Sequence, residues 1–259
     1  MKISRRSFLK MGGTFALGFT ALPGLKAFAA SGLLKASPDP KALAGKKWAM
    51  AINMKVCREK GPEGCKECVV ACHQVHNVPD IGNPKEEVKW IWKEPFANAF
   101  PGQEHEYLEE TVKGQPFLVL CNHCDNPPCV RVCPTQATFK RKDGIVVMDD
   151  HRCIGCRFCM AACPFGARSF NFRDPRPYIP KLNREFPTRE KGVVEKCNFC
   201  VERLAAGLSP ACVEACRHGA LVFGDLEDPN AGIRDVLSSR FTIRRKPELG
   251  TRPKVYYVV

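Results

Sequence analysis

The chain has 259 residues, enough for one large domain or two small ones, and a formal charge of +13 from 40 basic and 27 acidic side chains. The basic residues are scattered and form no run of five or more, which argues against the single basic stripe typical of nucleic-acid binding. Sixteen cysteines, far above ordinary usage, make thiol chemistry the feature to explain.

Residues 1–30 have the form of a twin-arginine export signal, with SRRSFLK at 4–10, an apolar stretch over 11–24 and an A-x-A cleavage pattern at 27–29. We expect its removal, which predicts a periplasmic protein. The alternative, a retained membrane anchor, is disfavoured because glycines and a proline interrupt the apolar stretch, which is shorter than the roughly 20 residues of a spanning helix. The removed segment contains five basic residues and no acidic residue, so its loss lowers the formal charge of the chain from +13 to +8.

The sixteen cysteines fall into four groups of four along the chain. Group 1 is Cys57, Cys65, Cys68 and Cys72; group 2 is Cys121, Cys124, Cys129 and Cys133; group 3 is Cys153, Cys156, Cys159 and Cys163; group 4 is Cys197, Cys200, Cys212 and Cys216. Group 3, followed by a proline, matches the ferredoxin pattern C-x2-C-x2-C-x3-C-P. In that pattern three cysteines hold one iron–sulfur cube and the fourth holds the other cluster of a pair, so the groups are expected to work in pairs.

Other uses of these cysteines fit less well. Export favours disulfides, but cysteines two residues apart are poorly placed to pair with each other. The spacing within group 4 alone would suit a structural zinc site, but the presence of three other cysteine groups in the same chain argues against zinc. No C-x2-C-H haem motif occurs. Sixteen thiolates divide into four [4Fe–4S] clusters, each of charge about −2 when oxidised, and these would offset the +8 of the exported chain.

The sequence predicts an α+β fold of two ferredoxin-like units, each with two clusters, one inserted within the other, with small sheets, short helices and long loops. In chain order we expect a strand over 48–53, a strand over 115–120, a short helix over 128–133, strands over 137–140 and 145–148 around a hairpin turn, and strands over 167–172, 192–194 and 220–226. The inserted unit covers about 115–175, and the outer unit comprises 31–114 and 176–259.

Pairing groups 2 and 3, and groups 1 and 4, by the crossing rule gives four predicted ligand sets. They are Cys57, Cys65, Cys68 and Cys216; Cys72, Cys197, Cys200 and Cys212; Cys121, Cys124, Cys129 and Cys163; and Cys133, Cys153, Cys156 and Cys159.

At this point the chain closely resembles the four-cluster ferredoxin subunits of membrane and periplasmic oxidoreductases, such as polysulfide, tetrathionate and nitrite reductase systems. The matching stretches are CNHCDNPPC at 121–129, DGIV at 143–146, CIGCRFCMAACP at 153–164, KCNFC at 196–200, PACVEAC at 210–216 and GTRPKVYY at 250–257. Group 1 departs from the family in the seven residues between Cys57 and Cys65, where two are usual, which makes ligation by Cys57 the least secure.

Within that family, the export signal and the segment 73–92 resemble the DsrO branch, the periplasmic ferredoxins of the membrane complex that accompanies dissimilatory sulfite reduction. The resemblance implies a quinone-interacting membrane subunit of the NrfD type, a multihaem cytochrome c and further subunits as partners. Membrane contact would then occur only through partners, and no nucleic acid is involved.

The predicted function is an electron relay rather than an enzyme, because fully ligated clusters leave no open iron position for a substrate. The alternatives are the iron–sulfur subunit of a periplasmic molybdopterin reductase and a structural metal-binding module. Two further questions stay open. The aromatics of segment 74–114 (Trp90, Trp92, Phe96 and Phe100) pack on the core, form a partner-docking surface, or do both. The histidines His73, His123 and His151 either tune the clusters or are solvated or packing residues.

Overall fold

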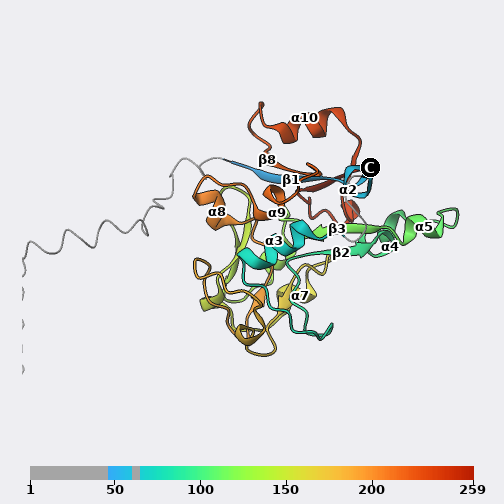
Figure 1. The fold of residues 1–259 in the computed structure, drawn as a ribbon. Coiled ribbons are helices and arrows are strands. Elements are labelled where there is room, and N and C mark those ends of the chain that lie inside the picture. Colours follow the sequence, from blue (N-terminus) through green and yellow to red (C-terminus); the bar gives the residue numbers. More distant parts are fainter. Residues whose placement is uncertain (1–45, 60–64) are drawn as a thin grey trace, which may run out of the picture. The chain divides into compact units, whose positions relative to one another are not determined.

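The computed structural model describes residues 46–59 and 65–259, which belong to one compact unit (Figure 1). The predicted export signal and most of the long loop of group 1 lie outside these residues. Within the described part of the chain, no helix combines the length and the apolar character that crossing a bilayer requires.

Small sheets, short helices and long loops make up the fold, which confirms that part of the predicted class. The strands are β1 (Trp48–Asn53), β2 (Ile91–Pro95), β3 (Pro116–Leu120), β4 (Thr138–Lys140), β5 (Val146–Met148), β6 (Ser169–Phe170), β7 (Val194–Glu195), β8 (Leu221–Asp225), β9 (Thr242–Ile243) and β10 (Val255–Val258). The α-helices are α2 (Met54–Glu59), α3 (Glu67–Val75), α4 (Phe96–Ala99), α5 (Glu110–Lys113), α6 (Pro128–Arg131), α7 (Phe158–Ala161), α8 (Val201–Ala205), α9 (Ala211–Glu214) and α10 (Gly232–Ser239). The 3-10 turns are η2 (Pro101–Gln103), η3 (Asp150–Arg152), η4 (Arg176–Tyr178) and η5 (Pro247–Leu249).

The largest sheet joins segments from both ends of the described chain, in the order β8-β1-β10-β9. Strand β1 pairs antiparallel with β8 and parallel with β10. It is apolar along its length because both of its faces are covered: Met50 and Ile52 face the main core, whereas Ala49 and Ala51 pack with Ile233 of helix α10. Figure 1 shows α10 lying over this sheet.

The segment 90–100 is part of the core. Strand β2 pairs antiparallel with β3, and the four aromatic residues of the segment are all buried, at 9% exposure or less. Phe100 is in ring contact with Phe117 and Tyr257, at centroid distances of 5.2 and 5.1 Å. The packing alternative therefore holds for these four side chains, which are not available as a surface.

The remaining strands form two short ribbons. Strands β4 and β5 pair antiparallel across the predicted hairpin turn, where Gly144 takes a φ of +79°. Strand β6 pairs with β7, so the segment that follows group 3 is joined directly to the segment that precedes group 4.

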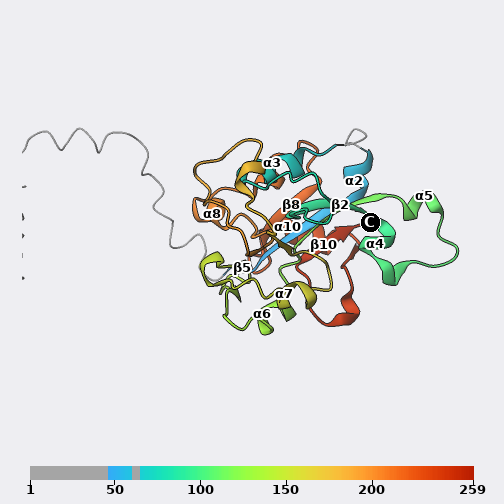
Figure 2. The ribbon, with the colours of Figure 1, turned by 90° about the horizontal axis from the view of Figure 1, so that it is seen from below.

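Two helix pairs carry cysteines from different groups. Helix α3 packs against α9 (Figure 1), and α6 packs against α7 (Figure 2). The first pair brings together segments that are distant in sequence, Cys68 and Cys72 on α3 with Cys212 on α9. The second brings Cys129 on α6 beside Cys159 on α7. Each pair thus places cysteines of two groups at one location.

Candidate metal centres

The first set of cysteines lines a single cavity. Its walls include Cys57, Cys65, Cys68 and Cys216. The thiols with the strongest electrostatic effect on Cys68 are those of Cys57, Cys216 and Cys65. Cys57 reaches this cavity from helix α2, despite the long loop that follows it. We call this set quartet I; it has the composition that the crossing rule predicts.

Quartet II consists of Cys72, Cys197, Cys200 and Cys212, all of them buried. The thiols with the strongest electrostatic effect on Cys72 are those of Cys197, Cys212 and Cys200. Two main-chain N–H groups already point at sulfur here, from Phe199 to Cys197 Sγ at 3.5 Å and from Ala211 to Cys200 Sγ at 3.4 Å. Such donors stabilise a thiolate or a bound sulfide.

Quartet III lines a second cavity, with Cys121, Cys124, Cys129 and Cys163 in its wall. The side chain of Asn122 lines the same cavity, and neither its Nδ2 nor its Oδ1 has a hydrogen-bond partner among the described residues. The neighbouring His123 accepts the Val146 N–H at Nδ1 (3.2 Å), so its proton is on Nε2. An unpartnered buried amide beside four thiols fits an iron–sulfur cluster, because its N–H groups can donate to sulfur.

Quartet IV is the most exposed set. Cys159 is buried and has Cys153 as an electrostatic neighbour, whereas Cys156 is exposed. Cys133 lies among the N–H groups of Thr138, Thr135 and Ala137; burial alone would raise the pKa of its thiol, but these hydrogen bonds outweigh burial and the pKa is lowered. The structure thus links Cys153 with Cys159 directly, and sequence spacing associates Cys133 and Cys156 with them.

Electrostatic interactions between the thiols of different quartets follow a linear order. Cys212 of quartet II has Cys68 of quartet I as an electrostatic neighbour. Cys197 of quartet II has Cys121 of quartet III as its strongest thiol neighbour. Cys159 of quartet IV has Cys129 of quartet III as its strongest. The sets therefore follow one another as I, II, III and IV, with the wholly buried quartet II inside and the exposed quartet IV at one end.

Burial disfavours the ionised form of several of these thiols. Desolvation raises the pKa of Cys68 and of Cys124 to about 12 and that of Cys200 to about 11, with neighbouring thiols adding to the rise for Cys68 and Cys124. Because the thiolate is the metal ligand, iron must supply the positive charge that ionises them. No three of the described His, Cys, Asp and Glu side chains converge as ligands of a single metal ion.

Groups 2, 3 and 4 share one local backbone conformation. The residue before the second cysteine of each C-x2-C is left-handed: His123 (φ 42°), Gly155 (φ 69°) and Phe199 (φ 56°). His123 and Phe199 also stack face to face, with ring centroids 3.7 Å apart, between quartets II and III. The spacing of the cysteines predicted the groups. The structure shows in addition that groups 2, 3 and 4 contain the same left-handed turn.

The three histidines that the sequence singled out differ. His151 is exposed and pairs with Glu190, at 3.8 Å, so the solvated alternative holds for it. His73 is partly buried, and desolvation lowers its pKa. His123 is fully buried beside quartet III.

Sequence reasoning missed several buried polar residues around the cysteines. His76 contacts Cys72 through Nδ1, which lies 3.6 Å from Sγ, and burial lowers the pKa of His76 to about 4. Arg189 is buried beside quartet II, where it forms an ion pair with Glu195 and stacks on Trp90. Lys196, next to Cys197, donates to the main-chain oxygen of Cys197 at 2.7 Å. A charged residue directly beside a cysteine, as in Lys196-Cys197, was the available sequence signal.

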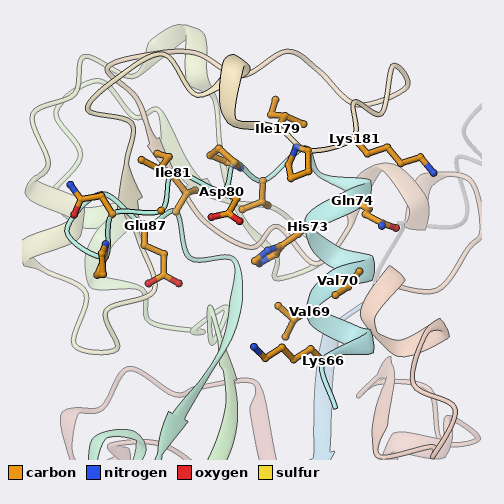
Figure 3. Close-up of a pocket in the computed structure, with 17 residues that line it drawn as sticks. Lys66, Val69, Val70, His73, Gln74, Asp80, Ile81, Glu87, Ile179 and Lys181 are labelled. Carbon is orange, nitrogen blue, oxygen red and sulfur yellow. The ribbon is translucent and has the colours of Figure 1, made fainter. Parts of the chain in front are cut away.

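A separate cavity of about 740 Å³ contains no cysteine in its lining. Figure 3 shows it against one face of α3, which contributes Val69, Val70 and His73, with Asp80 and Lys181 supplied by two loops. Helix α3 therefore faces two sites, with Cys68 and Cys72 toward the quartets and other side chains toward this cavity.

Comparison with known proteins identifies related iron–sulfur subunits. The family model described as "4Fe-4S dicluster domain" matches residues 113–226. The Hdr-like menaquinol oxidoreductase iron-sulfur subunit 1 of Archaeoglobus fulgidus is 40% identical over 98% of this chain and 97% of its own length. A tetrathionate reductase subunit of Salmonella typhimurium is 38% identical over 100% of this chain and 89% of its own length. The menaquinone reductase iron-sulfur cluster-binding subunit of Nitratidesulfovibrio vulgaris is 35% identical over 82% and 88%.

The chain belongs to the family of iron–sulfur electron-transfer subunits of respiratory oxidoreductase complexes. Within such a complex it is an electron-transfer subunit and not the catalytic one.

The turn of group 3 gives a specific prediction. A Cβ added at Gly155 would lie 2.5 Å from the carbonyl oxygen of Gly192, and 3.1 Å from the Phe170 ring. We expect Gly155→Ala to displace the loop of Cys153 and Cys156 and to lower the iron content of the purified protein. Gly166→Ala is the matched control, because Gly166 is also left-handed (φ 63°) but has open space around it. Equal iron in both variants would contradict the steric explanation.

Proposed function

We propose that the chain carries four [4Fe–4S] clusters, one in each quartet, and passes single electrons along the order I, II, III, IV. The observation that supports this most is the series of thiol neighbours that links the quartets end to end. When bound, each cluster takes up and releases one electron. The polypeptide contributes by fixing the spacing, excluding water around quartet II and supplying donors such as Asn122 to sulfur.

The same proposal includes two nested ferredoxin-like units. The pair α6 and α7 with ribbon β4–β5 would form the inserted unit over about 115–175. The pair α3 and α9 with strands β1 and β8 would form the outer unit, built from segments on both sides of the insertion. The crossing of ligands between groups follows from this arrangement, because each helix pair serves two quartets.

The family resemblance extends the proposal to a location and to partners. We infer export through the twin-arginine signal, a periplasmic site at the cytoplasmic membrane, and a DsrO-type role beside an NrfD-type quinone-interacting subunit and a multihaem cytochrome c. The A. fulgidus relative, whose name states that it belongs to a menaquinol oxidoreductase, supports the link to quinol. The segment 74–114 would contact the membrane subunit, since part of it lines the cavity on α3 close to quartets I and II.

A second candidate is the iron–sulfur subunit of a periplasmic molybdopterin reductase. The 38% identity to the tetrathionate reductase subunit favours it almost as much as the 40% identity to the menaquinol oxidoreductase subunit favours the first. The level of identity therefore does not distinguish the two candidate functions. Identification of the partner subunits would distinguish them.

The cluster number is tested by metal analysis. We expect anaerobically purified protein to contain roughly 16 iron and 16 sulfide per chain, because four cubes require four of each. Stoichiometric zinc with no reducible iron would instead support a structural metal-binding module and would end the relay proposal.

The crossed ligand sets are tested at Cys163, which lies in group 3 but lines the cavity of quartet III. We expect Cys163→Ala to change the electron paramagnetic resonance signal of the cluster held by Cys121, Cys124 and Cys129. Cys156→Ala, in the same group but in quartet IV, should change a different signal. If both variants alter the same cluster, the crossed assignment is wrong.

The physiological partner is tested by purification of the native complex from membranes under mild detergent. For the sulfite-linked complex we expect an NrfD-type membrane protein and a multihaem cytochrome c to accompany the chain, visible in peptide mass spectra and in haem absorbance. A molybdopterin-containing subunit without a cytochrome would favour the second candidate.

A further inference from the structure

Arg168 is a buried cation in the wall of the quartet III cavity. Its side chain lines that cavity with the four cysteines, and the residue is only 5% exposed. The guanidinium is held in place by two hydrogen bonds, from Nη2 to Thr138 Oγ1 at 2.7 Å and from Nη1 to Met148 Sδ at 3.6 Å. Both partners are neutral, so neither balances its charge.

No carboxylate among the described residues forms an ion pair with Arg168. Two other buried cations do have one: Arg189 pairs with Glu195, and Lys254 lies 3.6 Å from Asp125. Burying an unpaired charge costs several kcal/mol in a typical protein interior. The ionisable groups that Arg168 does face are cysteine thiols, which become anionic when they bind metal. Burial alone would lower the pKa of Arg168, yet the net shift is upward because of Cys129, Cys159 and Cys121.

The position of Arg168 is defined by the internal repeat. It is the fifth residue after the last cysteine of group 3, and the equivalent residues in groups 2 and 4 are Thr138 and Leu221. The backbone agrees, because the third residue after the last cysteine is left-handed in all three groups: Gln136 (φ 55°), Gly166 (φ 63°) and Gly219 (φ 65°). Leu221 lines the quartet I cavity just as Arg168 lines that of quartet III. An apolar side chain therefore fits this position.

We propose that Arg168 tunes electron transfer through its fixed positive charge. This charge raises the reduction potential of the cluster held by quartet III above the value that its thiolates alone would give. The inference rests on the proposed clusters. Adding one electron makes the cluster more negative by one charge, so a nearby cation stabilises the reduced state more than the oxidised state. Cys159 of quartet IV also faces Arg168, which is the strongest charge acting on that thiol, so we expect the potential of the fourth cluster to shift in the same direction.

The test is a potentiometric titration of the loaded protein, with clusters followed by electron paramagnetic resonance, in Arg168→Leu and Arg168→Lys. In the leucine variant we expect the ratio of reduced to oxidised cluster III at a fixed applied potential to fall about tenfold, which corresponds to a shift of about 59 mV for one electron. The lysine variant keeps the charge and should retain most of the potential. Arg152→Gln is the control, because Arg152 precedes Cys153 but its side chain is 63% exposed and paired with Asp149.

The outcomes separate the possibilities. Four clusters with unchanged potentials in Arg168→Leu would overturn the inference, and so would an equal fall in the leucine and lysine variants, since charge would then not be the cause. If the leucine variant fails to take up iron, Thr138→Val decides: loss of the hydroxyl that anchors the guanidinium should shift the same cluster, and no shift counts against the inference. A wild-type protein without four reducible clusters would instead refute the proposed function itself.

Discussion

Four thiolates around one cavity repel one another, and in this protein they do so in a largely buried environment. Burial raises the pKa values of Cys68, Cys124 and Cys200, so ionisation of these three thiols is disfavoured unless a positive charge lies close by. Ionisation requires a positive centre in each cavity, so metal binding and folding are linked through the same side chains. The cysteines are also part of the hydrophobic core, where Cys68, Cys72 and Cys197 pack with the aliphatic and aromatic residues. Small sheets suffice because the clusters would hold the segments together.

The excess of basic residues has a structural counterpart in buried cations near the cysteines. Arg189 is neutralised by Glu195, and this network also binds Trp90 through its indole N–H, at 3.1 Å from Glu195. Lys196 is held by main-chain carbonyl groups and Arg168 by neutral side chains, and neither has a carboxylate partner among the described residues. Buried cations such as Lys196 and Arg168, which have no carboxylate partner among the described residues, need an anion from another source. Clusters of charge about −2 would be such anions, which gives the buried part of the basic excess an electrostatic role unrelated to nucleic acid.

Local patterns in the sequence predicted local structure well. Strand β1 has the expected bounds, the Asp143-Gly144 turn forms the expected hairpin, and the cysteine groups meet in sets that match the crossing rule where the structure links them. Strand β10, strand β2 and helix α10 were not predicted, because pairing between segments distant in sequence determines them: β10 becomes a strand beside β1, and β2 beside β3. Arg168 was missed for a related reason, since its burial depends on contacts from Thr138 and Met148 that no spacing rule reveals.

The repeat shared by cysteine groups 2, 3 and 4 also defines where their sites differ. Three equivalent turns hold His123, Gly155 and Phe199, and three equivalent positions hold Thr138, Arg168 and Leu221. Identical cavities would give their clusters nearly equal potentials, and an electron would then have no preferred site along the line. A preference requires residues that break the repeat without disturbing the ligands. A charge in one cavity and an aliphatic side chain in its equivalent is the simplest such difference, because it changes electrostatics while the backbone that presents the cysteines stays the same.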